Sequence, residues 1–202
     1  MRIIHISDTH SKHNQLGELP AADILVHSGD FTWAGSEQEA YDFLNWLCDL
    51  PYKHKIFIAG NHDDCMYGAG TIEGLPENVH YLCNSSITID GLKFYGVPMF
   101  MQDCIDGIYD KLFQSIPEDT DVLISHQPPR IICDWADSGN NPTRHGDPIL
   151  AERVSKLNLK YHLFGHEHDA NGTIKIGKTI FSNASILNNE YNIVNKARLF
   201  EI

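Results

Sequence analysis

Short apolar runs that end in polar residues recur along the chain. They are Ile3 to Ile6, Asp23 to His27, Lys55 to Ala59, Val122 to Ser125 and Tyr161 to Phe164. Apolar runs of this length, bounded by turn residues, are typical of buried β-strands. A crossover joins the first two runs and a helix joins the second to the third. This order predicts an α/β protein with a parallel sheet.

A helix is predicted between the second and third of these strands. Apolar residues recur on one of its faces, at Ala40, Phe43, Leu44, Leu47 and Leu50. Ser36 and Glu39 form a capping box at its start, and Pro51 ends it. Further helices are expected at Tyr109 to Gln114 and at Pro148 to Leu157.

The rest of the chain predicts shorter strands and one long loop. The shorter strands are Val79 to Leu82, Ser86 to Asp90, Leu92 to Val97, Thr173 to Ile176, Thr179 to Ser182 and Arg198 to Ile202. Asp90-Gly91 and Gly177 mark hairpin turns. Asp134 to Asp147 is rich in Gly, Asn, Pro and Asp, and is expected to form the longest loop. No repeat or linker interrupts residues 1–202, which predicts a single domain.

The bulk composition narrows the classes of protein. The 202 residues are 42% hydrophobic and 21% charged, as in an ordinary globular protein. The net charge of −12 argues against an extended nucleic-acid partner, because such binders present a basic surface. Five cysteines show no zinc or disulfide spacing, and no apolar run approaches the length of a membrane span. These features predict a cytoplasmic protein with no membrane partner.

Side chains that can bind metals follow each of the five buried strands. They are Asp8 and His10, Asp30, Asn61 and His62, His126, and His166 and His168. Asp and Asn are common in turns for backbone reasons, so any one of these positions could be an ordinary turn. Histidine has no such preference, yet four of the five strands end at or next to one. The carboxyl ends of parallel strands lie along one edge of a sheet, so we expect these groups to converge.

Two metal ions fit this set of side chains better than one. Asp8 and His10 are two residues apart, as are His166 and His168, and in an extended segment such pairs point to the same side. The carboxylate, amide and imidazole groups are too many for one tetrahedral site. They suit two adjacent metals that share a carboxylate. Mn²⁺ is the first expectation, and Fe or Zn²⁺ would also accept these ligands.

The ordered blocks resemble those of a known family. The calcineurin-like metallophosphoesterases carry blocks similar to Asp8-Thr9-His10, Gly29-Asp30, Gly60-Asn61-His62-Asp63, His126 and Gly165-His166-Glu167-His168. The stretches HSGDFTWAG, LPYKHKIFIAGNHD and SHQPP look closest to the small metallophosphoesterase-domain-containing subfamily. Some members of that subfamily are described as cyclic nucleotide phosphodiesterases. The resemblance implies a four-layer α/β/β/α sandwich.

The resemblance also implies a role for each block. The first metal would be bound by Asp8, His10 and His168, the second by Asn61, His126 and His166, and both by Asp30. His62 would not be a ligand. It would face the phosphate and either protonate the departing oxygen or stabilise a non-bridging oxygen, after in-line attack by a metal-bridging hydroxide. Some mammalian relatives carry glycine at the first histidine of the last block, which weakens a metal site, whereas this chain keeps His166.

One stretch departs from the phosphoprotein phosphatase branch of the family. That branch follows its Gly-Asp with an Asp and an Arg that orient the catalytic histidine and bind phosphate. This chain has Phe31-Thr32-Trp33-Ala34 there, which argues against a protein phosphatase. The residue that orients His62 is therefore unassigned, and Asp63 is a candidate.

The remaining histidines have less specific interpretations. His5 and His27 lie within strands, and we expect them to be hydrogen-bonded in the core or beside the ligands. Positions at the surface or at strand ends are expected for His13, His54, His80 and His162. Arg144 and His145 lie in the long polar loop and are either substrate contacts or solvated charges.

The predicted activity is hydrolysis of a small phosphoester by a two-metal enzyme. Phosphodiesters such as cyclic nucleotides are the first expectation, contacted by Asn61 and His62, and phosphomonoesters are the second. A non-catalytic interaction scaffold of the same fold is the alternative from another class, and it would be expected to have lost ligands or His62. The charge balance disfavours a nuclease that acts on long polynucleotides. The oligomeric state is left open.

Overall fold

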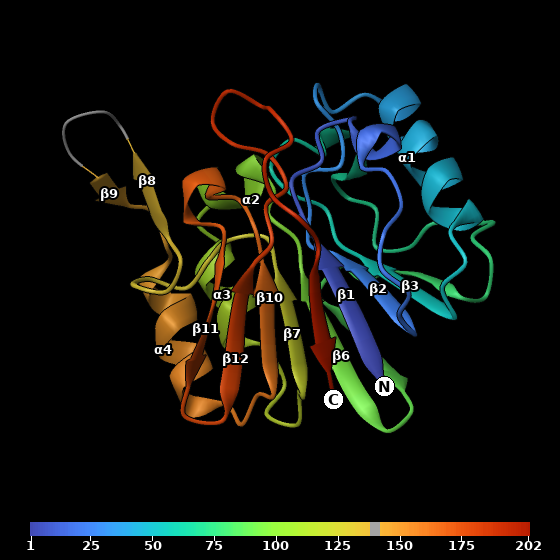
Figure 1. The fold of residues 1–202 in the computed structure, drawn as a ribbon. Coiled ribbons are helices and arrows are strands. Elements are labelled where there is room, and N and C mark those ends of the chain that lie inside the picture. The colour runs from blue at the N-terminus through green and yellow to red at the C-terminus, as the bar shows by residue number, and fades with distance from the viewer. Residues whose placement is uncertain (138–141) are drawn as a thin grey trace.

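Alternate residues of the strands pack into different apolar cores, which arranges the chain as four layers. The structure is a computed structural model that describes residues 1–137 and 142–202. Two β-sheets lie face to face and helices cover their outer faces (Figure 1). The order helix, sheet, sheet, helix confirms the fold class that the family resemblance implied.

The first sheet holds the N-terminal strands. Its order is β13 (Arg198–Glu201), β1 (Arg2–Ile6), β2 (Ile24–His27), β3 (His54–Phe57) and β4 (Val79–Tyr81). All neighbours are parallel except β13 and β1. Helix α1 (Glu37–Asp49) covers the outer face, where Phe43 and Leu47 pack into one core with Ile4 and Leu25.

The second sheet holds most of the later strands. Its order is β11 (Gly172–Ile176), β12 (Thr179–Asn183), β10 (Tyr161–Phe164), β7 (Val122–Ser125), β6 (Leu92–Val97) and β5 (Ser85–Ile89). Only the two edge pairs, β11–β12 and β5–β6, are antiparallel. Helices α3 (Tyr109–Gln114) and α4 (Pro148–Lys156) share a core with its outer face, and α2 (Met101–Ile105) precedes α3.

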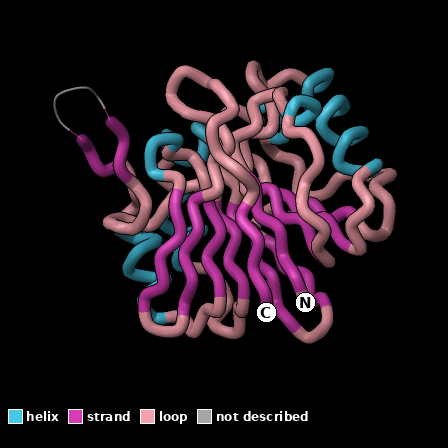
Figure 2. The backbone as a smooth tube through the Cα atoms, in the orientation of Figure 1, coloured by secondary structure: helices cyan, strands magenta, loops and turns pink. Residues whose placement is uncertain are grey.

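The five strands that precede the candidate ligands are divided between the two sheets. β1, β2 and β3 belong to the first sheet, whereas β7 and β10 belong to the second. Residues of both sheets, such as Val26 and Ile124, share one core between them. Loops that follow the strands gather at one end of the sandwich (Figure 2). The candidate ligands were predicted to converge at the edge of one parallel sheet. They instead converge at the common end of two sheets.

Helix α1 forms as its sequence predicts. The Ser36 side chain accepts a hydrogen bond from the Glu39 backbone, and the Glu39 side chain closes the capping box. At the other end, the buried Lys55 ammonium donates to the carbonyl oxygens of Cys48 and Leu50, each at 2.9 Å. This contact satisfies carbonyls that the end of a helix leaves without partners. None of the described helices has the length and apolar composition of a membrane span.

The stretch expected to form the longest loop contains a hairpin. Strands β8 (Trp135–Asp137) and β9 (Pro142–Arg144) pair in antiparallel register, and residues 138–141 of the predicted loop lie outside the described residues. All three residues of β9 are exposed, and Trp135 is 43% exposed. These strands therefore carry no apolar alternation that a sequence pattern could reveal.

Two histidines expected at the surface or at strand ends are buried instead. His13 packs against the rings of Phe43 and Trp46 and forms a 3.0 Å contact with Asp42. His162 is fully buried, with Nε2 at 2.8 Å from the Ser125 hydroxyl. Each imidazole forms a hydrogen bond at one edge and packs its ring against apolar neighbours. The polar character of histidine therefore does not show whether the side chain is exposed or buried.

His5 and His27 are fully buried and hydrogen-bonded, as expected from their places within strands. His5 contacts the Ser28 hydroxyl at 2.8 Å in the first sheet and the Ser182 hydroxyl at 3.1 Å in the second. His27 contacts the Thr9 hydroxyl at 3.0 Å. These imidazoles therefore hydrogen-bond neighbouring strands and loops to one another, close to the strand ends that carry the candidate ligands.

Replacing His162 with glutamine is expected to make the protein less sensitive to acid. Burial lowers the pKa of His162 to about 3, from an ordinary value of 6.5. Between these pH values the unfolded chain binds a proton here and the folded chain does not. The free energy of unfolding therefore falls with falling pH, by up to about 1.4 kcal/mol per pH unit.

Urea unfolding of the parent and of His162→Gln from pH 7 to pH 4 measures this slope. Glutamine can still donate to the Ser125 hydroxyl but does not titrate. Other acid-sensitive groups are common to both proteins, so the difference between the slopes isolates His162. Equal slopes would contradict the prediction.

Candidate metal centre

The seven predicted ligands lie in the loops that leave five strands. Asp8 and His10 follow β1, Asp30 follows β2, Asn61 follows β3, His126 follows β7, and His166 and His168 follow β10. Four of the seven have positive φ angles: Asp8 at 55°, His10 at 40°, Asp30 at 57° and His166 at 70°. Residues with a Cβ seldom adopt this conformation outside tight turns and functional sites. The sharp turns point to a constrained geometry in each of these loops.

Two of these turns leave no space for a side chain at a neighbouring glycine. A Cβ on Gly60 would lie 2.2 Å from Asp30 Oδ1, and a Cβ on Gly165 would lie 2.2 Å from Asp8 Oδ2. Real Cβ atoms essentially never approach closer than 3.0 Å. The glycines of the sequence blocks therefore let backbone come close to the two carboxylates.

The first group of ligand atoms comprises Asp8, His10 and His168, whose donor atoms all lie within 4.8 Å of one another. His10 Nδ1 donates to the Thr32 carbonyl at 3.1 Å, and His168 Nδ1 donates to the Asn188 carbonyl at 3.0 Å. These hydrogen bonds leave the Nε2 atoms of the two histidines facing each other at 3.3 Å. Two lone pairs at this distance require a proton or a cation between them.

The second group comprises Asp30, His126 and His166, again with all donor atoms within 4.8 Å. His126 Nδ1 donates to the Ser28 carbonyl at 2.9 Å. Its Nε2 lies 3.3 Å from Asp30 Oδ2 and 3.1 Å from Asn61 Oδ1. Asp30 Oδ2 is also 3.7 Å from His10 Nε2, so Asp30 lies between the two groups. Backbone carbonyls that fix the Nδ1–H tautomer are the usual partners of metal-binding histidines.

The electrostatics of the ligands suit cations. Burial opposes ionisation of Asp30, but the charge of His126 and its hydrogen bond lower the pKa of Asp30 to about 2. Burial lowers the pKa of His10 and of His166 to about 4, so both are neutral at pH 7. Burial also opposes a charge on His126, yet Asp30 and then Asp8 raise its pKa to about 10. A proton on His126 thus takes the place that a cation would take, and binding a cation would release it.

The donor set and its geometry therefore fit two metal ions. Imidazole nitrogens, carboxylate oxygens and one amide oxygen are ligands of Mn²⁺, Fe and Zn²⁺. Asp8, His10 and His168 would hold one ion, and Asn61, His126 and His166 would hold the other. Asp30 is placed to contact both.

His62 lies beside the seven predicted ligands and, like three of the histidines among them, contacts a backbone carbonyl through its ring. Its Nδ1–H donates to the Trp33 carbonyl at 2.9 Å, so Nε2 faces away from the backbone. Its backbone N–H donates to Asp30 Oδ1 at 2.8 Å. His62 also forms a third group of possible metal donors with His10 and Asp30, so proximity alone does not separate a ligand from a proton donor.

Asp63 does not orient His62, contrary to the candidate role suggested by the sequence. Its buried carboxylate accepts hydrogen bonds from the backbone N–H groups of Gly60 at 2.8 Å, Asp30 at 2.9 Å and Thr32 at 2.9 Å. Burial, and then the charge of Asp30, raise the pKa of Asp63 to about 7. Asp63 ties two loops together, and the Trp33 carbonyl contacts the His62 ring. A backbone carbonyl from the Phe31-Thr32-Trp33-Ala34 stretch thus supplies the orienting contact.

The side chains of Arg144 and His145 have different surroundings in the structure. Arg144 forms a 2.5 Å ion pair with the buried Asp134 and does not line the cavity at the metal-ligand groups. His145 does line this cavity, and its Nδ1 lies 3.2 Å from Glu167 Oε1. Glu167, to which sequence analysis assigned no role, is a buried part of the cavity wall. Its position between His166 and His168 was the signal that could have identified it.

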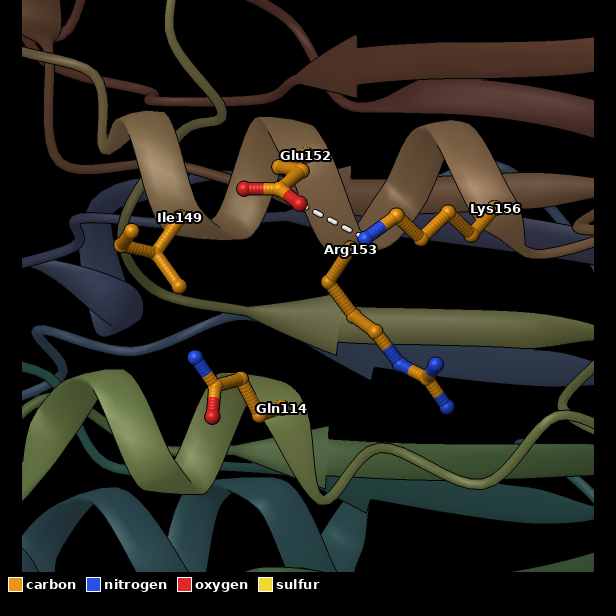
Figure 3. A pocket seen from close by; sticks show the side chains of 5 residues that line it. All are labelled: Gln114, Ile149, Glu152, Arg153 and Lys156. Atoms are coloured by element: carbon orange, nitrogen blue, oxygen red, sulfur yellow. Dashed lines mark hydrogen bonds and ion pairs between the residues drawn. The ribbon is translucent and has the colours of Figure 1, made fainter.

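The cavity lined by the candidate metal-binding side chains has a volume of about 270 Å³. Its wall consists of His10, Asp30, Asn61, His62, Ala136, His145, His166, Glu167, His168, Asn189 and Tyr191. Asn189 and Tyr191 lie in a late loop that the sequence did not connect with the site. A second cavity of about 150 Å³ lies between α3 and α4 (Figure 3). It contains no histidine, and its Lys156 and Glu152 pair with each other at 2.6 Å, so it offers no comparable metal chemistry.

Comparison with known proteins gives relatives along the whole chain. Residues 1–170 match the family model described as calcineurin-like phosphoesterase. UPF0046 protein C25E10.12 of Caenorhabditis elegans is 34% identical over all of this chain and 81% of its own length. Metallophosphoesterase domain-containing protein 1 of Homo sapiens is 32% identical over 96% of this chain and 68% of its own length. The chain belongs to the calcineurin-like phosphoesterase family.

Proposed function

We propose that the protein is a two-metal phosphoesterase that prefers small phosphodiesters such as cyclic nucleotides, and that residues 1–202 act as one catalytic domain. The observation that carries this proposal is the pair of ligand groups on either side of Asp30, with His62 beside them. When bound, two metal ions would neutralise charge on the phosphate and lower the pKa of a water molecule. Mn²⁺ is our first choice of metal, with Fe or Zn²⁺ as the alternatives.

His62 is proposed as the general acid. Because the Trp33 carbonyl accepts the Nδ1 proton, Nε2 is the atom that faces the cavity. The protonated ring would give its Nε2 proton to the oxygen that leaves phosphorus. Asp30 Oδ1 accepts the His62 backbone N–H and so couples the position of the acid to the proposed bridging ligand. We propose that Asn61, which lines the cavity beside His126, contacts both a metal and the substrate.

A diester is favoured over a monoester by the charges of the cavity. The described residues of its wall include no lysine or arginine, and Arg144 is engaged by Asp134. A monoester dianion carries one more negative charge than a diester, and Glu167 in the wall adds another. The net charge of −12 disfavours long polynucleotides. A scaffold without catalytic activity is less well supported, because all seven predicted ligands and His62 are present.

Hydrolysis by the Mn²⁺-reconstituted chain tests the proposal. The substrates are bis-p-nitrophenyl phosphate, p-nitrophenyl phosphate and the 2′,3′- and 3′,5′-cyclic nucleotides. We expect kcat/KM to be higher for diesters than for the monoester. Activity on the monoester alone would contradict the diester preference. Metal binding without hydrolysis of any of them would favour the scaffold.

A further inference from the structure

Two aromatic rings form a corner beside the candidate metal ligands. The ring centroids of Trp33 and Tyr191 are 4.5 Å apart, with the planes at 75°. Tyr191 also packs edge-on against the rings of His10 at 5.2 Å and His168 at 5.4 Å. Trp33 lies 6.4 Å from the His62 ring. The corner therefore extends from the first ligand group toward the proposed general acid.

Neither ring is fully buried, although Tyr191 packs against the edge of the first apolar core. Trp33 is 47% exposed, and Tyr191 is a half-buried part of the cavity wall. By contrast Phe31, two residues before Trp33, is fully buried and stacks on Phe43 at 4.3 Å. The segment thus directs one aromatic ring into the fold and leaves the other at the surface. Trp33 contacts Tyr191 and His62 within the fold, and the exposed part of its indole is open to a further stacking partner beside the polar cavity.

The backbone holds Tyr191 in this place. Tyr191 has a φ angle of 58°, and its N–H donates to the Asn188 carbonyl at 2.8 Å. The Asn188 side chain accepts the Asn192 N–H at 2.8 Å, which closes the loop. The Asn188 carbonyl also accepts the Nδ1–H of His168 at 3.0 Å. One loop therefore orients a candidate ligand and presents an aromatic ring, and a left-handed residue is common at such sites.

We propose that Trp33 and Tyr191 form a stacking subsite for a planar aromatic group of the substrate, such as a nucleobase. This inference rests on the proposed phosphoesterase function, because the subsite is defined relative to a phosphate held between the candidate metal ligands and His62. The described wall of the cavity has no basic side chain other than histidine. A planar group away from the phosphate would therefore meet no cationic side chain of the Lys or Arg type there, and the two rings offer it a stacking contact, which every base can make through its π-face.

The test compares two substrates that share one reacting group. Adenosine 2′,3′-cyclic phosphate carries a base, and methyl riboside 2′,3′-cyclic phosphate carries a methoxy group in its place. For the Mn²⁺-loaded full chain, we expect Trp33→Leu to lower the ratio of kcat/KM for the first over the second by about 5- to 150-fold. This range corresponds to the loss of one base stack. Tyr191→Leu is the second variant and should lower the ratio in the same direction.

Tyr41→Leu is the matched control, because it removes an aromatic side chain that is 61% exposed on α1. It should keep the parent ratio. A parent ratio near one, or a ratio that both corner variants leave unchanged, would overturn the stacking subsite while the phosphoesterase activity itself stands.

A parent that hydrolyses neither compound would instead contradict the proposed function, and binding then decides about the subsite. Calorimetric titration of the Mn²⁺-loaded protein with adenosine 5′-monophosphate and with ribose 5-phosphate needs no turnover. Tighter binding of the nucleotide that Trp33→Leu abolishes supports the subsite. Equal binding of the two compounds, or binding of neither, overturns it.

Discussion

Replacing His62 with alanine is expected to lower kcat by about 10²–10⁴-fold and to leave the metal content unchanged. The His62 ring contacts the chain through Nδ1 and the Trp33 carbonyl, which leaves Nε2 for the substrate. Truncation removes this proton donor, whereas the backbone N–H that binds Asp30 remains. Steady-state hydrolysis of a cyclic nucleotide measures kcat, and elemental analysis of the desalted protein measures the metal.

His80→Ala is a suitable control for His62→Ala. His80 lies on β4, where its ring stacks on that of His54, and it contacts none of the candidate ligands. A parent-like kcat for His62→Ala would show that another group protonates the leaving oxygen. Loss of metal together with activity would place His62 among the ligands, in the group that it forms with His10 and Asp30.

Replacing Gly165 with alanine is expected to remove metal from the first ligand group with a single methyl. The new Cβ would lie 2.0 Å from Ser7 Oγ and 2.2 Å from Asp8 Oδ2. Asp8 must then move, and with it the hydrogen bond that its Oδ1 accepts from the His166 N–H at 3.0 Å. Loss of a group that merely orients a ligand costs 10–100-fold in affinity or activity. Displacing the ligand itself should therefore lower the metal affinity by more than about 100-fold.

Gly70→Ala is the matched control for Gly165→Ala. A Cβ on Gly70 would meet no atom within 4 Å, and its φ angle is not in the left-handed region. The control should therefore keep parent metal content and activity. Asp8→Asn is a second variant that weakens the same ligand without a steric clash, in case Gly165→Ala fails to fold. Full metal content in both variants would contradict the assignment of Asp8.

The strands and the main helix could be predicted because local sequence determines them. Val122–Ser125 appears with the predicted bounds, and the Ser36 capping box starts α1 where the sequence indicates. The sheet to which each strand belongs was not predictable from the apolar runs, since β7 and β10 look like β2 in sequence but lie opposite it. Partner choice between strands depends on packing of the whole chain. The family resemblance, rather than periodicity, supplied the four layers.

The candidate site was predictable where side-chain type carries the chemistry. Aspartate and histidine at strand ends indicated the side chains that the structure brings together in two groups of candidate ligands. The contact that orients His62 was not predictable, because a backbone carbonyl, that of Trp33, has no signature in residue type. Tyr191 was also missed, since it reaches the cavity through the conformation of a loop far along the chain. The burial of His162 likewise depends on tertiary packing, which the presence of a histidine in a predicted strand does not reveal.

The left-handed backbone conformation of His166 favours its replacement by glycine. A φ angle of 70° costs a residue with a Cβ about 1–3 kcal/mol, and glycine adopts it almost freely. Exchanging histidine for glycine there would remove a candidate ligand and relax the backbone, so the exchange would weaken the candidate metal site while favouring folding stability. Backbone strain and the candidate metal site therefore make opposing demands on this position.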